Sequence, residues 1–212
     1  MKNRFPCRFC DIINGHYKYP NVDKPIMDNS DYLAIASIGA IVKGWTLVVP
    51  KKHKCSMKSS YGDDSFNSLM QKLIPLMVLK YGRLVAFEHG SNREGSPTGC
   101  GINHAHMHIV PVDISLMDEL LDTELRWKEC YLSEVADISG EDEYLLYADI
   151  SNDLNWKNHI CAVHLLKKPI SQFFRKIISN RVGKEEYFDY KTYPFLYESQ
   201  KTRENLSEIS YL

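Results

Sequence analysis

Residues 103–110 have the sequence Asn103-His104-Ala105-His106-Met107-His108-Ile109-Val110. Histidines and apolar residues alternate along it. Because successive side chains of a β-strand point to opposite faces, a strand here puts His104, His106 and His108 on one face, in steps of roughly 6.5 to 7 Å. The apolar residues between them then face the core. The pattern predicts a strand that carries three imidazoles in a row.

Further elements are predicted on either side of this strand. Period-two patterns favour strands at residues 32–36, 46–50 and 84–87, and a possible hairpin at 143–150 and 159–166. Apolar residues at helical spacing predict a helix from Ser65 to Gly82, kinked at Pro75, and Ser171 is expected to cap another helix that ends before Gly183. Residues 90–101, rich in Gly, Ser and Pro, indicate a loop.

Composition limits the classes of function. Apolar residues make up 44% and charged residues 25% of the 212 residues, as in an ordinary globular protein. A formal net charge of -1 supplies no broad attraction to polymeric nucleic acid or to a membrane surface, so a phosphate-bearing partner must be recognised locally. The residues Met1 to Pro6 contain no apolar signal segment, and no stretch approaches a membrane span, so we expect a cytoplasmic protein.

The histidine row suits chemistry at phosphorus. A neutral imidazole is a nucleophile near neutral pH when a neighbour, such as His108 or a backbone carbonyl, fixes the tautomer with a free ring nitrogen. Backbone N–H groups of the preceding loop, Gly95 to Gly101, can cradle phosphate oxygens. From the pattern alone, a surface metal site or three unrelated solvated histidines remain open.

Three ordered blocks resemble the histidine triad (HIT) superfamily. They are the opening Cys7-Arg8-Phe9-Cys10-Asp11-Ile12-Ile13-Asn14-Gly15, the strand Gly44-Trp45-Thr46-Leu47-Val48-Val49-Pro50-Lys51-Lys52-His53, and the triad from His104 to Val110. The resemblance covers residues 5–113. It implies an α+β fold, an antiparallel sheet with helices, commonly paired into a homodimer that hydrolyses or transfers nucleoside monophosphates. We expect a HIT-like nucleotide-binding domain at 1–135 and a C-terminal extension with a hairpin and a helix at 136–212.

The resemblance assigns roles to individual residues. His106 would attack the α-phosphorus of a small nucleotide substrate to form a covalent nucleotidyl-imidazole, His108 would position it, and His89 would protonate the leaving group or be structural. In zinc-containing bacterial members the ligands correspond to Cys7, Cys10, His53 and His104, a closed Cys2His2 set that implies structural zinc. The alternative is a reduced Cys-x-x-Cys pair with an unligated His53.

Several positions depart from the family pattern. Trp45 stands where a histidine is common, and Gly99-Cys100-Gly101 where Gly-Gln-Ser/Thr is common, so the backbone N–H groups of Gly101 and Ile102 are expected to contact phosphate beside Cys100. The asparagine that usually precedes the triad corresponds to Arg93, and the adjacent Asn92 is the candidate. The segment from Ser171 to Arg175 resembles one in longer HIT-like proteins and predicts either a capped surface helix or an anion-binding helix end.

Three functions follow from these residues. The first is a nucleotide hydrolase or nucleotidyl transferase that works through His106. The second is a metallohydrolase in which His104, His106 and His108 hold a catalytic zinc. The third is a nucleotide-binding module that has lost its chemistry.

Overall fold

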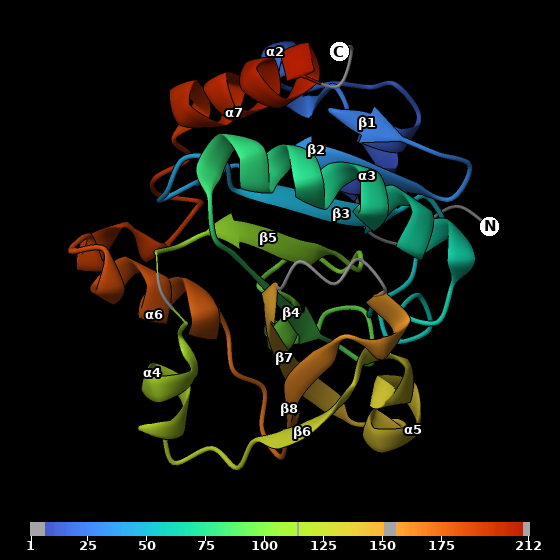
Figure 1. Ribbon diagram of the computed structural model, residues 1–212, viewed down its shortest axis with the longest axis vertical. Coiled ribbons are helices and arrows are strands. Elements are labelled where there is room, and N and C mark those ends of the chain that lie inside the picture. Colours follow the sequence, from blue (N-terminus) through green and yellow to red (C-terminus); the bar gives the residue numbers. More distant parts are fainter. Residues whose placement is uncertain (1–6, 114, 151–155, 210–212) are drawn as a thin grey trace.

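The protein, a computed structural model, is built on one antiparallel sheet of eight strands (Figure 1). The structure describes residues 7–113, 115–150 and 156–209. The residues Met1 to Pro6, on which part of the cytoplasmic expectation rests, lie outside them. In sequence order the strands are β1 Met27–Asp28, β2 Tyr32–Ala36, β3 Thr46–Pro50, β4 Leu84–Gly90, β5 Met107–Pro111, β6 Lys128–Tyr131, β7 Glu143–Ile150 and β8 Ile160–Leu166.

Helices cover both faces of this sheet. The α-helices are α1 Arg8–Ile13, α2 Pro20–Asp23, α3 Asp64–Tyr81, α4 Met117–Leu121, α5 Val135–Ser139, α6 Phe173–Arg181 and α7 Leu196–Ile209. Short 3-10 turns occur at Pro97–Gly99, Leu132–Glu134, Trp156–Asn158 and Glu185–Phe188. The fold is therefore α+β, as predicted. Among the described residues, no helix is both long and apolar enough to cross a membrane.

The strand order is β1-β2-β3-β5-β4-β7-β8-β6, which places the histidine strand β5 between β3 and β4. β4 also pairs with β7 along its whole length, from Leu84 opposite Ile150 to Gly90 opposite Tyr144. The predicted boundary between residues 135 and 136 lies in α5, and strands on both sides of it belong to the same sheet. Both edges of β4 are paired within the chain.

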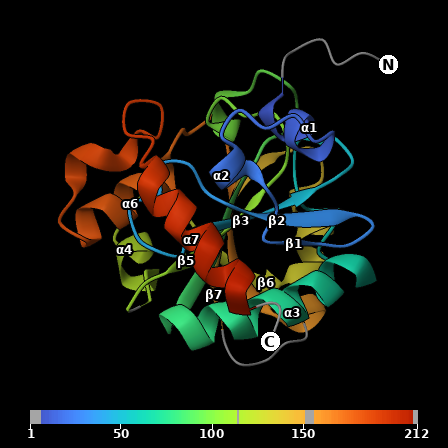
Figure 2. The same cartoon turned by 90° about the horizontal axis from the view of Figure 1, so that it is seen from above.

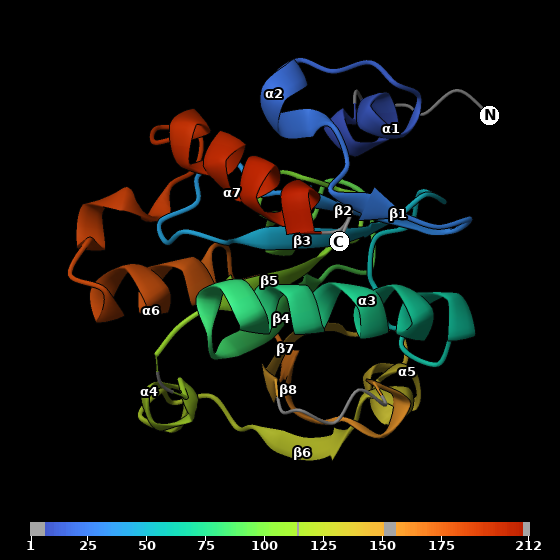
Figure 3. The same cartoon turned by 45° about the horizontal axis from the view of Figure 1, so that its top comes forward.

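Two apolar cores lie on the two faces of the sheet. One contains the buried side of α3, from Phe66 to Met77, together with Leu206 of α7. The other contains Phe9 of α1, Leu120 of α4 and Phe174 of α6. Seen from above, α7 lies between α2 and α3 (Figure 2), and Figure 3 shows α1 and α2 at the end of the molecule opposite β6.

Helix α3 begins and ends as its sequence predicts. The carboxylate of Asp63 accepts a hydrogen bond from Ser65 N at the N-cap, and Gly82 closes the helix at a φ of 80°. The helix continues through Pro75.

Three local predictions differ from the structure. β5 begins at Met107, so His104 and His106 precede the assigned strand, and β4 runs on to Gly90. The prediction that Ser171 caps α6 was wrong: Gln172 is the N-cap residue, at a left-handed φ of 58°, and makes no side-chain cap bond. The sequence analysis made no prediction for the residues that form α7.

Candidate functional site: a histidine cavity beside a cysteine–histidine cluster

The three triad histidines lie on one side of the chain, although only His108 belongs to β5. The rings of His106 and His108 are 4.8 Å apart, and Phe9 packs edge-on against His104 at 5.7 Å and His106 at 5.2 Å. The alternating apolar residues, among them Met107, point into the opposite core. The predicted division of faces is confirmed, with the difference that the histidines also face a core and are mostly enclosed.

His106 is held as one tautomer. Its Nδ1 lies 2.9 Å from the carbonyl oxygen of His104, which can only accept, so Nδ1 carries the proton and donates it. The Nε2 atom therefore keeps its lone pair. Loss of solvent around the ring lowers the pKa of His106 to about 4. The imidazole is neutral at neutral pH, as a nucleophile requires.

His108 is oriented by Trp45, the residue that departs from the family pattern. The indole Nε1 donates to Nδ1 of His108 at 2.9 Å, and His108 stacks on Phe87 with ring centroids 4.4 Å apart. Because an indole N–H can only donate, Nδ1 of His108 is an acceptor and its proton sits on Nε2. Burial also lowers the pKa of His108 well below the usual value.

A cavity of about 50 Å³ opens beside these rings. Strand β5 contributes His108, the preceding segment His106, and β4 His89. Arg175 and Tyr190, from the C-terminal part of the chain, form another wall. The two halves of the sequence thus build one site.

His89 faces this cavity from the strand beside β5. It is largely buried, and its Nε2 atom has no hydrogen-bond partner. Burial, followed by the charges of His106 and Arg175, lowers the pKa of His89 to about 3. The imidazole is therefore neutral at neutral pH.

The predicted phosphate loop lies at the cavity, but some of its backbone N–H groups already donate hydrogen bonds within the loop. Cys100 and Ile102 line the cavity, while Gly101 lines an adjoining pocket with Ile102. The N–H of Ile102 already donates to Gly99 O at 2.9 Å. The Cys100 thiol accepts a hydrogen bond from Gln172 N at 3.0 Å. The backbone of Cys100 is in the left-handed region, at a φ of 54°.

Asn92, the remaining predicted contact, lies apart from the cavity. Its side chain donates to Glu141 O at 3.0 Å, and its backbone N–H points to Glu143. The structure thus brings His89, His106, His108, Cys100 and Ile102 around one cavity and leaves Asn92 outside it.

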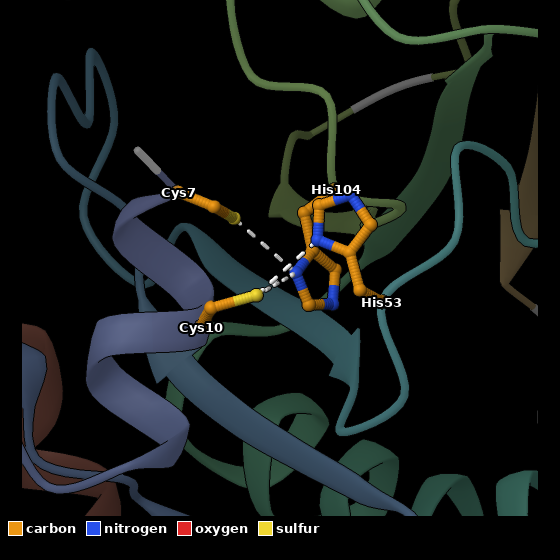
Figure 4. Close-up of side chains that lie close together, drawn as sticks. All are labelled: Cys7, Cys10, His53 and His104. Atoms are coloured by element: carbon orange, nitrogen blue, oxygen red, sulfur yellow. Dashed lines mark hydrogen bonds between the residues drawn. The ribbon is translucent and has the colours of Figure 1, made fainter. Parts of the chain in front are cut away.

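A second cluster lies at the His104 end of the triad (Figure 4). The two cysteines flank the first turn of α1, and their thiols point at two imidazoles from distant segments. The potential ligand atoms of Cys7, Cys10, His53 and His104 all lie within 4.8 Å of one another. Tetrahedral ligation with these donor types needs edges of about 3.3 to 3.8 Å, so the group fits a single ion after small adjustments.

Polar groups behind the cluster orient its imidazoles. His104 donates from Nε2 to Pro50 O at 2.7 Å, which leaves Nδ1 facing Cys7 Sγ at 3.4 Å. The Nε2 atom of His53 lies 3.3 Å from a carboxylate oxygen of Glu94. Such partners fix the tautomer of metal-ligating histidines. The cluster is therefore suited to hold a metal ion.

The geometry disfavours a three-histidine metal site. His104 faces the cysteines, and the Nδ1 atoms of His106 and His108 are hydrogen-bonded in other directions. In the part of the chain that the structure describes, no cluster of potential metal ligands includes His106 or His108.

Sequence reasoning missed three contributors to the site. Trp45 was noted only as a departure, Tyr190 carried no recognisable motif, and Glu94 was not considered. All three act through contacts between residues distant in sequence, so no local signal identifies them. Arg175 had a weak signal, the segment from Ser171 to Arg175.

Comparisons with known proteins identify the family. An uncharacterized HIT-like protein of Methanocaldococcus jannaschii is 34% identical over 107 residues, which cover 50% of this chain and 78% of that protein. The chain belongs to the histidine triad family. The protein named hit of Bacillus subtilis is 31% identical over 111 residues, covering 50% of this HIT chain and 70% of the relative. No family model matches the sequence.

Solved structures of HIT proteins also align with this HIT chain. A zinc-bound histidine triad family protein from Mycobacterium smegmatis is 22% identical with a TM-score of 0.37, covering 50% of this chain and 73% of that one. A hypothetical histidine triad nucleotide-binding protein from Sulfolobus tokodaii is 17% identical with a TM-score of 0.41, covering 96% and 93%.

Proposed function

We propose that this HIT protein is a nucleotide hydrolase or nucleotidyl transferase that acts at the α-phosphate of a nucleoside monophosphate conjugate or a dinucleoside polyphosphate. The observation that carries the proposal is the bond from His106 Nδ1 to His104 O. It leaves Nε2 of His106 as a lone-pair donor beside a cavity. Membership of the HIT family supports the same substrate class.

The reaction has two displacement steps. In the first, Nε2 of His106 forms a bond to the α-phosphorus while the bond from phosphorus to the leaving group breaks, and the leaving group takes the electron pair. In the second, water or another acceptor forms a bond to phosphorus and any proton on the attacking oxygen passes to solvent, while the N–P bond breaks and its electron pair returns to Nε2 of the imidazole. The Nε2–H of His108, held by Trp45, is available to a phosphate oxygen or to the departing group.

We further propose that Cys7, Cys10, His53 and His104 hold one structural zinc. The donor set consists of two thiols and two imidazoles, which suit zinc, and it is closed by four protein ligands. When bound, the ion would tie α1 to the segments that carry His53 and His104. It would fix the backbone carbonyl of His104 that orients His106.

The test is a comparison of two histidine variants. Wild-type protein, His106→Ala and His164→Ala are incubated with adenylylated and guanylylated substrates, and release of nucleoside monophosphate is followed. His164 is the matched control, because its Nδ1 also bonds a backbone carbonyl, Arg126 O at 2.8 Å, but on β8. We expect turnover to fall by at least about 1,000-fold in His106→Ala alone, and quenching of the wild type in alkaline denaturant to trap a nucleotidyl-histidine, whose N–P bond is labile to acid.

Other outcomes select among the alternatives. Binding of AMP without turnover of any substrate by the wild type would favour a nucleotide-binding module. Residual turnover in His106→Ala that disappears on chelation would favour metal-based hydrolysis. The homodimer expected from the resemblance stays a prediction, which light scattering of the purified protein tests.

A further inference from the structure

Arg175, in the first turn of α6, ties the C-terminal part of the chain to the triad cavity. Its side chain is only 3% exposed. The guanidinium donates from Nε to Phe188 O at 2.6 Å and from one terminal nitrogen to Gly39 O at 2.5 Å. A Cβ at Gly39 would clash with Tyr190, so the segment after α6 lies directly on the loop that follows β2.

The charge of Arg175 has no carboxylate partner among the described residues. The other buried contacts of the guanidinium are with the ring faces of Trp45 at 4.8 Å and Tyr190 at 5.9 Å. Ion pairs recorded in the described part of the chain involve other residues, including Arg8, which pairs with Asp23. Burial lowers the pKa of Arg175 to about 10, so the group stays cationic at neutral pH. A buried charge without a counter-ion is costly unless a ligand supplies one.

Arg175 and His89 lie on the same cavity as the nucleophile. Two of the five guanidinium N–H donors are used by the two carbonyl bonds, which leaves further donors for a ligand. His89 lines the cavity with a buried Nε2 atom that has no hydrogen-bond partner. A buried guanidinium that makes no recorded ion pair, beside a buried imidazole nitrogen that donates when its proton is on Nε2, is an arrangement that an anionic oxygen completes.

We propose that Arg175 and His89 form an anion subsite beside His106, which receives the phosphate group next to the phosphorus that is attacked. The substrate is then a nucleotide whose leaving group begins with a phosphate, rather than a phosphoramidate or a simple phosphate ester. The inference rests on the proposed function for the identity of the reacting phosphorus. The subsite itself rests on the geometry of the C-terminal segment.

The subsite is tested by binding, which requires no turnover. The affinities of AMP and ADP are measured by calorimetry on the full-length wild-type protein, Arg175→Gln, Arg175→Lys and Lys184→Gln. Lys184 is the matched control, because it also reaches from the C-terminal segment to a carbonyl of the loop after β2, Ile41 O at 2.9 Å, but does not line the cavity.

We expect the wild type to bind ADP at least about 10-fold more tightly than AMP. Arg175→Gln should lose roughly 10- to 100-fold in ADP affinity with little change for AMP, and Lys184→Gln should keep the preference. Arg175→Lys should retain part of it, because an ammonium keeps the charge but not the planar fork. His89→Phe should weaken ADP binding by a smaller factor.

Two results would overturn the subsite. One is equal affinity of the wild type for AMP and ADP, a measurement that needs no variant. The other is an equal loss for both ligands in Arg175→Gln and Lys184→Gln, which would make Arg175 a tether between segments. Failure of the proposed function is separate, since it shows as absence of turnover while the ADP preference persists.

Discussion

The two ends of the histidine row differ in where their partners come from. His104 meets Cys7, Cys10 and His53, all from the first half of the chain. His106 and His108 open onto a cavity that Arg175 and Tyr190 close from the C-terminal part. The ligands at the first end all lie within the three blocks that resemble the family, whereas the second end is completed by residues outside those blocks. The two ends of the row therefore depend on different parts of the chain.

The largest expected effect concerns the cluster. Cys10→Ser should reduce bound zinc from about one per chain to near zero and lower the free energy of unfolding by several kcal/mol, because four-ligand zinc sites contribute folding energy directly. Metal analysis and thermal unfolding measure both. Cys55→Ser is the control, since Cys55 lies outside the cluster. Retention of metal and stability by Cys10→Ser would refute the zinc assignment.

A smaller effect is expected where Trp45 orients His108. Trp45→Phe removes the indole N–H that fixes the tautomer of His108, and we expect kcat to fall roughly 10- to 100-fold with nucleotide affinity and zinc content nearly unchanged. Trp45→His, which restores a ring N–H, should recover part of the rate.

The control for that substitution is Trp127→Phe, because the indole of Trp127 also donates, to Leu120 O at 3.1 Å, without touching the triad. If kcat is the same in Trp45→Phe and wild type, Trp45 only packs against the site. A loss confined to KM would lead to the same conclusion.

The smallest effect is on acid stability. The pKa of His89 is lowered to about 3 in the folded protein, chiefly by burial and then by His106 and Arg175, against about 6.5 when unfolded. The unfolded state therefore takes up a proton first, so stability is present above about pH 6.5 and is lost as the pH falls toward 3. The titration of His89 alone lowers the free energy of unfolding by about 2 kcal/mol at pH 5 relative to pH 7.

The variant His89→Gln measures that cost. It keeps a polar side chain but cannot titrate, so urea unfolding should show a shallower loss between about pH 7 and pH 5 than the wild type shows. His164→Ala, on strand β8 and away from the cavity, should follow the wild type. Parallel pH profiles for His89→Gln and wild type would show that His89 is not held neutral by the fold.

The local features of the protein could be predicted from its amino-acid sequence. Alternation of His104, His106 and His108 with apolar residues indicates which side of the backbone each side chain takes, because extended backbone points successive side chains to opposite sides, and this holds although His104 and His106 precede β5. Asp63 and Gly82 mark the ends of α3, since caps bond to backbone within a few residues. The blocks around Cys7, Gly44 and His104 sufficed to assign the family, because each is contiguous in sequence.

The residues that complete the cavity could be identified only from the tertiary structure. Arg175 reaches Gly39 across 136 positions of sequence, and Trp45 reaches His108 across 63. Burial of the guanidinium, the orphan nitrogen of His89 and the tautomers of His106 and His108 depend on which distant segments exclude water and which carbonyls they bring near. Propensity and periodicity act over a few residues, so they carry no information on such contacts. The triad can be recognised from a contiguous segment of sequence, whereas the residues that surround it in the cavity depend on tertiary packing.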